Sequence, residues 1–483
     1  MMSDMNDMEL IRKQGTPLYE QIAGKVASMV EKGAYRPGDR VPSIRSLSRQ
    51  MKVSVNTVRE AYGYLEVCRV IEARPQSGYY VCARLPDIPD EPGFIEREIH
   101  PTEVGVGDLA EMVMRDSANP DLIQLGASIP DPTLLPVDRL NRMMSSEVRR
   151  KPTVSVSYSL PPGHERLRKQ IAKRIINSGC VVGPEDVVIT NGCMEAVTLA
   201  LLATCKPGDT LAVESPAYYG FFQLIQQMGL KALEIPSTPT SGISIEALSY
   251  ALETTQVSAC LVVPNYSNPI GSLMPDEHKA QLVRLLERHD IPLIEDDINA
   301  DLSHSDERPL TAKRYDSTGN VLLCSSFTKT LAPGYRVGWM VPGRYLAQVQ
   351  RLKLLMNIAN ATPPQMAIAE FLANGGYDRH LRTIRRTYAK RVAMLGEAIG
   401  RHFPEGTRVT RPRGGFNLWV EMPEEVQALK LYSQALKQGI TITPGPLFSA
   451  SDKFHNYVRL NAAFYSEKNE FAIETLGKLA KKF

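Results

Sequence analysis

Short apolar runs alternate with amphipathic stretches in the middle of this chain, and few folds are compatible with that alternation. The runs lie at residues 186–192, 209–220, 259–271, 291–302, 320–330 and 336–343. Strands of a parallel sheet are covered by helices on both faces, so they are almost continuously apolar. The pattern therefore predicts an α/β domain with a mostly parallel sheet between two layers of helices.

Polar side chains collect at the ends of five of these runs. They are Thr190 and Asn191, Glu214 and Ser215, Asn265 to Asn268, Glu295 to Asp297, and Ser325 to Lys329. The carboxyl ends of parallel strands meet at one edge of the sheet, where α/β proteins bind their ligands. Five polar ends at a single edge predict one shared site.

Lys329 is the residue of this group that points most directly to a reaction. A lysine forms a Schiff base with an aldehyde when burial or a nearby cation lowers its pKa, and Arg336 is the candidate cation. Arg336 can also clamp a phosphate with two hydrogen bonds. Ser326 and Thr328 offer hydroxyl groups to the same anion. These residues predict a site for an aldehyde cofactor that carries a phosphate.

The segment after the first run predicts a second set of phosphate contacts. Gly192 begins a helix, so the backbone N–H groups near Cys193 and Met194 are free to face an anion. The dipole of the helix favours a negative charge at the same place. The sequence therefore places the N-terminus of this helix against the cofactor phosphate.

Three further residues suit an aromatic cofactor ring. Asp296, at a strand end, can hold a pyridinium nitrogen protonated, which makes the ring an electron sink. Tyr218 can stack on the ring, and Asn268 can donate to a ring hydroxyl. Taken singly, these residues are also explained as a solvated strand end, a core aromatic and a turn. Their joint occurrence favours the cofactor site.

The first eighty residues predict a different kind of domain. Apolar residues recur at helical spacing over 16–33, with Thr16 as a cap, and in two shorter helices that start near Ser43 and Ser54. The third helix is expected to bury Val55, Val58, Tyr62 and Leu65. Two short helices joined by a tight turn indicate a helix-turn-helix. A hairpin over 70–81, turning from Pro75 to Gly78, follows as a wing.

The charge of this segment favours nucleic acid as its partner. Residues 34–74 carry eight Lys or Arg and four Asp or Glu, a local excess of four positive charges, whereas the whole chain carries +3. A basic three-helix unit suits contacts with phosphates. A small helical docking module with solvated charges is the alternative.

The composition of the chain and the positions of its prolines suggest two domains joined by a linker. Residues 83–115 are proline-containing and show no clear periodicity, as is typical of a tether. The seven cysteines form no CxxC pair, so neither a disulfide framework nor a metal site is expected. The acidic start and the absence of a long apolar run argue against a signal peptide and a membrane span. We therefore expect a soluble, cytoplasmic protein.

Residues 38–66, followed by residues 77–81, resemble the winged helix-turn-helix of GntR-type bacterial repressors, and the likeness covers 15–82. The contacts with double-stranded DNA that it implies come from Arg45, Ser54, Asn56, Thr57 and Arg59, with Gly78 bringing the wing to the minor groove. Val55 departs from the pattern, since arginine is frequent there, and Cys68 replaces a usual helix-ending glycine. The operator sequence therefore cannot be copied from relatives.

Residues 116–483 resemble fold-type I aminotransferases, which use pyridoxal 5'-phosphate. The motifs are GCMEA at 192–196, ESPAYYG at 214–220, NYSNPIG at 265–271, EDD at 295–297, and SSFTK with PGYRVG between 325 and 338. The likeness implies a larger cofactor-binding part at about 160–365 and a smaller α+β subdomain at about 370–483. It also implies that Tyr158 reaches the phosphate of a neighbouring subunit and that Arg459 grips a substrate α-carboxylate. A homodimer follows from it.

A winged helix joined to an aminotransferase-like domain is the arrangement of the MocR branch of GntR regulators, which this chain resembles along its full length. Aminotransferases and most MocR relatives carry a tyrosine two or three positions after the first aspartate, where it contacts the cofactor ring oxygen. Ile298 and Asn299 occupy those positions here. Asn299 can still donate a hydrogen bond, yet an amide tunes a Schiff base differently from a phenol. Cofactor binding is expected, and efficient transamination is in question.

Three functions remain open from the sequence. The leading hypothesis is a transcriptional regulator with pyridoxal phosphate on Lys329, in which cofactor loading or an amino-compound effector shifts binding to operator DNA. The second is a working aminotransferase with an accessory N-terminal module. The third is a domain that has lost the cofactor and serves as a dimerisation scaffold.

Overall fold

The computed structural model describes residues 17–74, 77–82, 89–93, 99–105 and 107–483. The chain divides into two compact units, Met1–Ile88 and Pro89–Phe483. The predicted cap at Thr16 and the predicted turn residue Pro75 lie outside the described residues. No helix within the described ranges is long and apolar enough to cross a membrane.

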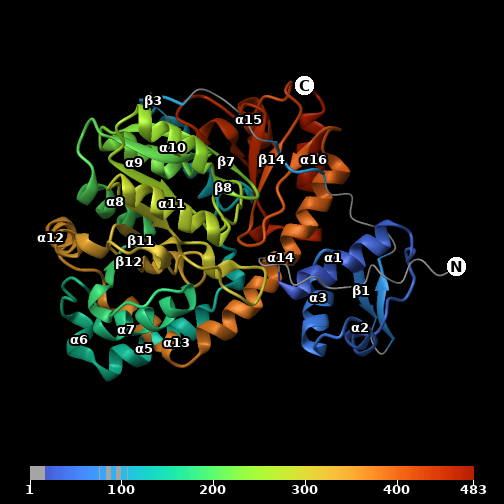
Figure 1. Ribbon diagram of the computed structural model, residues 1–483, viewed down its shortest axis with the longest axis horizontal. Helices are drawn as coiled ribbons and strands as arrows, with labels where there is room; N and C mark the ends of the chain where they lie inside the picture. Colours follow the sequence, from blue (N-terminus) through green and yellow to red (C-terminus); the bar gives the residue numbers. More distant parts are fainter. Residues whose placement is uncertain (1–16, 75–76, 83–88, 94–98, 106) are drawn as a thin grey trace. The chain divides into compact units, whose positions relative to one another are not determined.

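The N-terminal unit packs three helices against a hairpin. Its elements are α1 (Leu18–Glu31), α2 (Ile44–Met51), α3 (Val55–Val67), β1 (Ile71–Arg74) and β2 (Gly78–Val81) (Figure 1). The hydroxyl oxygens of Ser43 and Ser54 accept from Ser46 N at 3.2 Å and Thr57 N at 3.0 Å, so they cap α2 and α3. The core includes Ile22, Val26, Leu47, Val58, Tyr62 and Leu65. The winged helix-turn-helix prediction is confirmed.

Val55 differs from its prediction, because it is 40% exposed and lies outside the core. It is the first residue of α3, directly after the cap Ser54. The packed part of this helix face begins only at Val58. Val55 therefore belongs to the exposed start of α3, together with Asn56.

The hairpin explains the glycine at position 78. Strands β1 and β2 pair antiparallel, with Ile71 opposite Val81 and Arg74 opposite Gly78. Gly78 has a φ of +112°, and a Cβ at this position would lie 3.2 Å from the Nε atom of Arg40. The positive φ favours glycine here, and a Cβ would also require a small shift of the Arg40 guanidinium.

The larger unit is built on a nine-stranded sheet with the strand order β3-β7-β6-β9-β10-β11-β12-β5, and β8 pairs with β7. The strands are β3 (Pro101–Thr102), β5 (Val188–Thr190), β6 (Thr210–Ser215), β7 (Lys231–Thr238), β8 (Gly242–Ile243), β9 (Ala259–Val262), β10 (Leu293–Asp296), β11 (Val321–Ser326) and β12 (Gly338–Val341). The central strands from β7 to β11 are parallel, and β12 is antiparallel to both neighbours. The predicted mostly parallel sheet is confirmed.

Helices cover both faces of this sheet (Figure 1). α8 (Cys193–Thr204) and α9 (Tyr219–Gln227) pack on one face, and α10 (Ile245–Thr254) and α11 (Asp276–Arg288) pack on the other. The larger unit also contains α4 (Gly107–Ser117), α5 (Val137–Arg150), α6 (Pro152–Val156), α7 (Glu165–Ile175), α12 (Leu346–Asn357) and α13 (Thr362–Ala373). Because successive strand residues point to opposite faces, Leu211 and Val213 join the apolar cluster of α8 and α9, whereas Ala212 joins that of α10 and α11. Burial on both faces is the reason for the continuous apolar runs.

The C-terminal part of the larger unit carries a second, antiparallel sheet. Its order is β13 (Arg408–Val409), β14 (Asn417–Glu421), β17 (Tyr457–Asn461) and β16 (Thr443–Pro444). The long helix α14 (Gly376–His402) precedes it, and α15 (Ala428–Lys437) and α16 (Glu470–Ala480) lie in the same part of the chain. A short strand β15 (Ile440–Thr441) pairs with β4 (Ile123–Gln124). This is the smaller α+β subdomain expected from the sequence.

The segment expected to be a linker, residues 83–115, is only partly separate from the larger unit. Strand β3 pairs with β7, and most of α4 falls within the expected linker. The backbone N–H of Val409 donates to the oxygen of Asp90 at 2.7 Å. Residues 89–93, 99–105 and 107–115 therefore belong to the larger unit, and strand pairing and backbone hydrogen bonds provide contacts that sequence periodicity did not indicate.

Candidate functional site

Lys329 follows strand β11, and its amine donates to the backbone oxygen of Ser128. The pKa of Lys329 is lowered to about 8, first by burial and next by the cation of Arg459, while Asp296 opposes the shift. Arg336, the cation predicted from the sequence, also lowers the pKa of Lys329, but less than Arg459 does. Lys329 therefore becomes neutral and nucleophilic at a lower pH than an exposed lysine does.

Asp296 is a buried carboxylate at the end of β10, 5% exposed. The thiol of Cys193 donates to its Oδ1 atom at 3.2 Å, and the N–H of Ile298 donates to the same atom at 3.0 Å. Burial raises the pKa of Asp296 to about 6 despite these donors. Its Oδ2 atom accepts no hydrogen bond from the residues described. A cation or N–H group placed at Oδ2 would offset the cost of this buried charge.

The start of α8 lies against Arg336. Gly192, the N-cap, has a φ of +84°, and a Cβ there would lie 2.6 Å from the Nη2 atom of Arg336. The same Nη2 atom donates to the backbone oxygen of Asn191 at 2.9 Å. The first N–H groups of a helix, here those of Cys193 and Met194, have no acceptor within the helix. The Arg336 guanidinium and the N-terminus of α8 thus lie next to each other, and both are groups that favour a negative charge.

Ser326 and Thr328 form the turn between β11 and Lys329. The backbone N–H of Thr328 donates to the Ser326 hydroxyl oxygen at 3.3 Å. Ser326 is 6% exposed, while Thr328 is half-buried. Because the Ser326 oxygen accepts from the turn, its hydroxyl proton is free to donate to a ligand.

Arg459 is a fully buried arginine on β17, with 0% exposure. Its guanidinium donates to Asn268 Oδ1 at 2.9 Å, to the Gly126 oxygen at 2.7 Å and to the Thr443 hydroxyl at 3.2 Å. Its carbon Cζ lies 5.1 Å from the ring centre of Phe448. The Nε atom has no hydrogen-bond partner among the described residues. A buried cation with an unused donor is a ready site for a small carboxylate.

Tyr218 belongs to the same neighbourhood. Burial raises the pKa of its phenol above the usual value, and the charges of Arg459 and Asp296 act on it as well. Its ring centre lies 4.8 Å from that of Tyr219 and 5.5 Å from that of Phe221. The aromatic ring is therefore fixed by packing beside the polar site.

Two residues named from the sequence lie apart from this group. Tyr158 is 77% exposed, on a segment that is bridged to the end of α12 through Ser159 and Asn360. The side-chain amide of Asn299 donates to the backbone oxygen of Tyr266 at 2.8 Å, and Asn299 is 5% exposed. The amide nitrogen carries two N–H donors, and this bond uses one of them within the fold. The contact of Asn299 with a cofactor stays a prediction.

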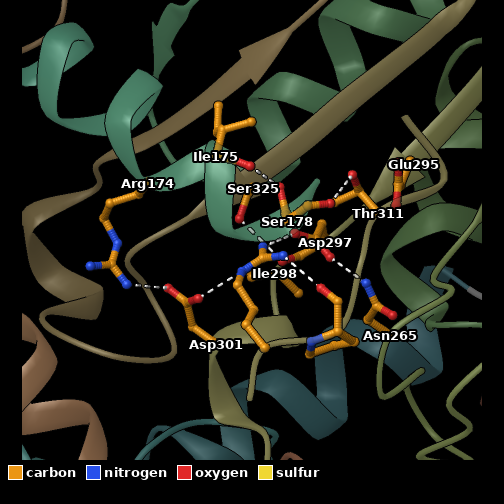
Figure 2. A network of polar contacts seen from close by, with 12 residues as sticks. Arg174, Ile175, Ser178, Asn265, Glu295, Asp297, Ile298, Asp301, Thr311 and Ser325 are labelled. Carbon is orange, nitrogen blue, oxygen red and sulfur yellow. Dashed lines mark hydrogen bonds and ion pairs between the residues drawn. The ribbon is translucent and has the colours of Figure 1, made fainter. Parts of the chain in front are cut away.

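A buried ion network lies beside the strand ends (Figure 2). Asp297, the residue after Asp296, forms an ion pair with Arg308 and accepts from Asn265 Nδ2 at 2.8 Å. Arg308 also binds Asp301, with 2.9 Å between its Nε atom and Oδ1. The cations of Arg308 and Arg174 lower the pKa of Asp301 to about 2, although burial alone would raise it.

Sequence reasoning missed three features of the site. Ser128 and Gly126 contribute backbone oxygens, which no side-chain pattern can reveal. Cys193 was named for its backbone only, whereas its thiol contacts Asp296. Arg308 belongs to no recognisable motif. The sequence could indicate only that the buried acids of the EDD motif require a cationic partner, without showing which residue it is.

The two units match different family models. Residues 122–476 match aminotransferase class I and II, and residues 18–81 match the bacterial regulatory proteins of the gntR family. This chain belongs to the MocR branch of GntR-type regulators. In this MocR-type regulator, the aminotransferase match includes Lys329, Asp296, Arg336 and Arg459.

Curated relatives support the assignment over the whole chain. This MocR-type regulator is 40% identical to the HTH-type transcriptional regulator YjiR of Escherichia coli (strain K12), over 95% of this chain and 98% of that protein. It is 26% identical to the HTH-type transcriptional regulator NorG of Staphylococcus aureus (strain USA300), over 89% of this chain and 96% of that protein. The expected regulator family is confirmed.

Solved structures resemble the larger unit of this MocR-type regulator. Kynurenine aminotransferase of Pyrococcus horikoshii, a complex with PMP, has a TM-score of 0.73 and 26% identity, over 79% of this chain and 95% of that chain. LysN, the α-aminoadipate aminotransferase of Thermus thermophilus, has a TM-score of 0.72 and 26% identity, over 77% of this chain and 94% of that chain. That structure carries N-(5'-phosphopyridoxyl)-L-leucine. The aminotransferase fold predicted from the sequence is confirmed.

Proposed function

We propose that this regulator holds pyridoxal 5'-phosphate on Lys329, and that loading of the cofactor or its reaction with an amino compound changes DNA binding by the N-terminal unit. The observation that carries the proposal is the half-buried amine of Lys329, which lies against the backbone oxygen of Ser128 and whose pKa is lowered to about 8 near the charges of Arg459 and Asp296. An amine of this kind attacks an aldehyde readily, whereas a structural lysine gains nothing from a lowered pKa.

The donor set fits each part of this cofactor. Lys329 would bind the aldehyde, and the Oδ2 atom of Asp296 would hold the ring nitrogen protonated. The phosphate would be bound by the N-terminus of α8 and by Arg336, Ser326 and Thr328. Tyr218 and Asn268 would flank the ring. When bound, the cofactor supplies an electron sink that weakens bonds at the carbon carrying an amino group.

Arg459 defines the chemistry of the effector in this proposal. Its charge acts on Lys329, and its Nε donor is unused among the described residues. An amino compound that reacts at Lys329 and also carries a carboxylate would satisfy Arg459 at the same time. Amino acids are therefore the favoured class of effector over simple amines.

The N-terminal unit presents the residues proposed to contact operator DNA. Arg45, Asn56 and Arg59 are exposed, and the Nη1 atom of Arg59 donates to Asn56 Oδ1 at 3.0 Å. The hydroxyls of Ser54 and Thr57 lie 2.7 Å apart at the start of α3. Ser54, Asn56, Thr57 and Arg59 lie at the start of α3, the second helix of the pair, which a helix-turn-helix inserts into the major groove. Arg45 lies at the start of α2. Gly78 is proposed to bring the wing to the minor groove.

A homodimer is proposed from an exposed apolar patch on the larger unit. Val156 is 86% exposed, Tyr158 77%, Leu160 54%, Leu355 76% and Ile358 50%. The backbone bridge between Ser159 and Asn360 places these two segments side by side. Clustered apolar side chains of this kind mark a protein interface, and a second copy of the chain that covers the patch would carry Tyr158 to the partner's site.

An absorbance titration tests the proposed function. The purified protein is titrated with pyridoxal phosphate and then with amino acids and simple amines, with and without promoter DNA. We expect a visible imine band that carboxylate-bearing amino compounds change and that DNA shifts. In the Arg459→Met variant, amino acids should lose their advantage over simple amines. A protein that stays colourless contradicts the proposal, and rapid turnover with a 2-oxo acid without any DNA shift assigns it to the aminotransferases instead.

The pH dependence of cofactor uptake gives a separate prediction. Only the neutral amine of Lys329 attacks an aldehyde, so the uptake rate should rise with pH and level off above the lowered pKa of about 8. An unperturbed lysine would make the rate rise until about pH 10.4. Stopped-flow absorbance measures the rate at each pH. A rate that keeps rising beyond about pH 10 contradicts the lowered pKa.

A further inference from the structure

A row of cations lies along the first half of α14, apart from the cofactor site. It consists of Arg379, Arg382, Arg386 and Lys390, called the α14 stripe below. The spacings of three, four and four residues place all four side chains on a single face of the helix. All four are exposed, and the residue between them on this face, Thr383, is exposed as well.

The α14 stripe has no anionic partner within the described part of the chain. Asp378, the neighbouring acid, lies 2.7 Å from Arg174 and is already paired. The two inward-facing arginines of the same stretch do have acceptors: Arg385 Nε donates to the backbone oxygen of Asp301 at 2.8 Å, and Arg391 lies 2.9 Å from the carboxylate of Asp131. The four outward cations make no side-chain hydrogen bond or ion pair among the residues described.

The other end of the same helix shows a different arrangement. Arg401 lies 3.8 Å from Glu397 and 2.6 Å from Glu470. Residues 376–391 hold six Lys or Arg and one Asp, a local charge of +5, which exceeds the +3 of the whole chain. Like charges three and four residues apart repel one another and destabilise a helix. An uncompensated row of four is therefore best explained by an anion supplied from outside.

The dimensions of the stripe match a duplex. From Arg379 to Lys390 the helix rises about 16 Å, at about 1.5 Å per residue. Phosphates of B-DNA recur at about 3.4 Å per strand along the axis, so the stripe spans about five base pairs. We propose that the α14 stripe binds the phosphate backbone of DNA outside the segment read by the winged helix.

This proposal rests on DNA binding by the N-terminal unit, as proposed above. A regular row of cations suits a regular row of phosphates better than the irregular acids of a protein surface. The chain that carries the stripe also carries a DNA-binding unit, so any bound duplex is held at a high local concentration. Weak contacts at the stripe then add to the affinity without any sequence preference.

Salt-dependent binding to a long duplex of arbitrary sequence tests the proposal. The full-length protein is compared with the variant R379Q/R382Q/R386Q/K390Q. The matched control K206Q/K231Q/R288Q/K430Q removes four exposed cations from four different places in the same unit. We expect the slope of log K against log salt to become shallower by about 3.6 in the stripe variant, at about 0.9 for each of the four lost phosphate contacts. The control should stay near the wild type.

Two further measurements separate this proposal from the others. Cofactor absorbance and circular dichroism should be unchanged in the stripe variant, which excludes misfolding as the cause. The variant R45Q/R59Q tests the winged helix: if it binds like the wild type, DNA binding by the N-terminal unit is wrong, whatever the stripe does. Equal slopes for the stripe variant and the control would overturn the stripe proposal and favour an acidic protein as its partner.

Discussion

Replacing Lys329 by alanine should remove all of the visible imine absorbance that pyridoxal phosphate gives the wild-type protein. The other cations at the site, Arg336 and Arg459, are guanidinium groups, which remain charged and do not replace an amine in this reaction. In DNA-shift experiments, amino compounds should then no longer change the binding of the variant.

The variant Lys329→Arg is the matched control for charge. It keeps a cation beside Asp296 and Ser128 but has no reactive amine, so it should lose the absorbance as alanine does while disturbing the fold less. Borohydride reduction followed by mass spectrometry should place the cofactor on the Lys329 peptide in the wild type only. A variant that keeps the imine band would show that another lysine carries the cofactor. Unchanged regulation by amino compounds would contradict the sensing role.

Sensing requires more than binding. A ligand shifts an equilibrium only by its difference in affinity for the two states. The effector must therefore bind the DNA-bound and DNA-free forms of the protein with different affinities. By reciprocity, the effector changes the affinity for DNA by the same factor by which DNA changes the affinity for the effector. The titration with and without promoter DNA measures this factor directly.

The sequence predicted the positions that depend on local pattern. Asp296 and Lys329 were found because polar residues interrupt apolar strands, and parallel strands bring those interruptions to one edge. Gly192 was found because a glycine before a helix frees backbone donors. The caps Ser43 and Ser54 followed from the same kind of local rule.

The rest depends on contacts between distant residues. The backbone oxygens of Gly126 and Ser128 face Arg459 and Lys329 across the fold, and backbone atoms leave no trace in a sequence. Arg459, not Arg336, is the stronger cation at Lys329, because proximity in space and not in sequence decides the electrostatic effect. The hydrogen bond from the Asn299 amide to the backbone oxygen of Tyr266 is another contact between distant residues that the sequence did not indicate.

The ion network beside the strand ends shows why the site tolerates so many buried acids. Asp297 has a fully buried side chain, and its ion pair with Arg308 is supported by Asn265. Arg308 also pairs with Asp301, so one cation compensates two carboxylates. A buried charge that loses its only partner costs far more than an exposed one.

Replacing Arg308 by methionine should therefore destabilise the larger unit by about 3–5 kcal/mol, the cost of leaving a buried carboxylate unpaired. Urea unfolding followed by circular dichroism measures the change. The control Arg408→Met breaks the exposed pair with Glu421, whose atoms lie 3.5 Å apart, and should cost less than about 1 kcal/mol.

A second substitution identifies the cause of the loss. Adding Asp297→Asn to Arg308→Met removes the unpaired charge, so the double variant should recover much of the lost stability even though a further native group is gone. If loss of packing around Arg308 were the cause instead, the double variant would be less stable than the single Arg308→Met variant. Recovery together with normal cofactor absorbance would show that the network sets the stability of the strand ends, while Lys329 and Asp296 carry the chemistry. Equal, small effects at Arg308 and Arg408 would contradict the assignment of Arg308 as the compensating cation.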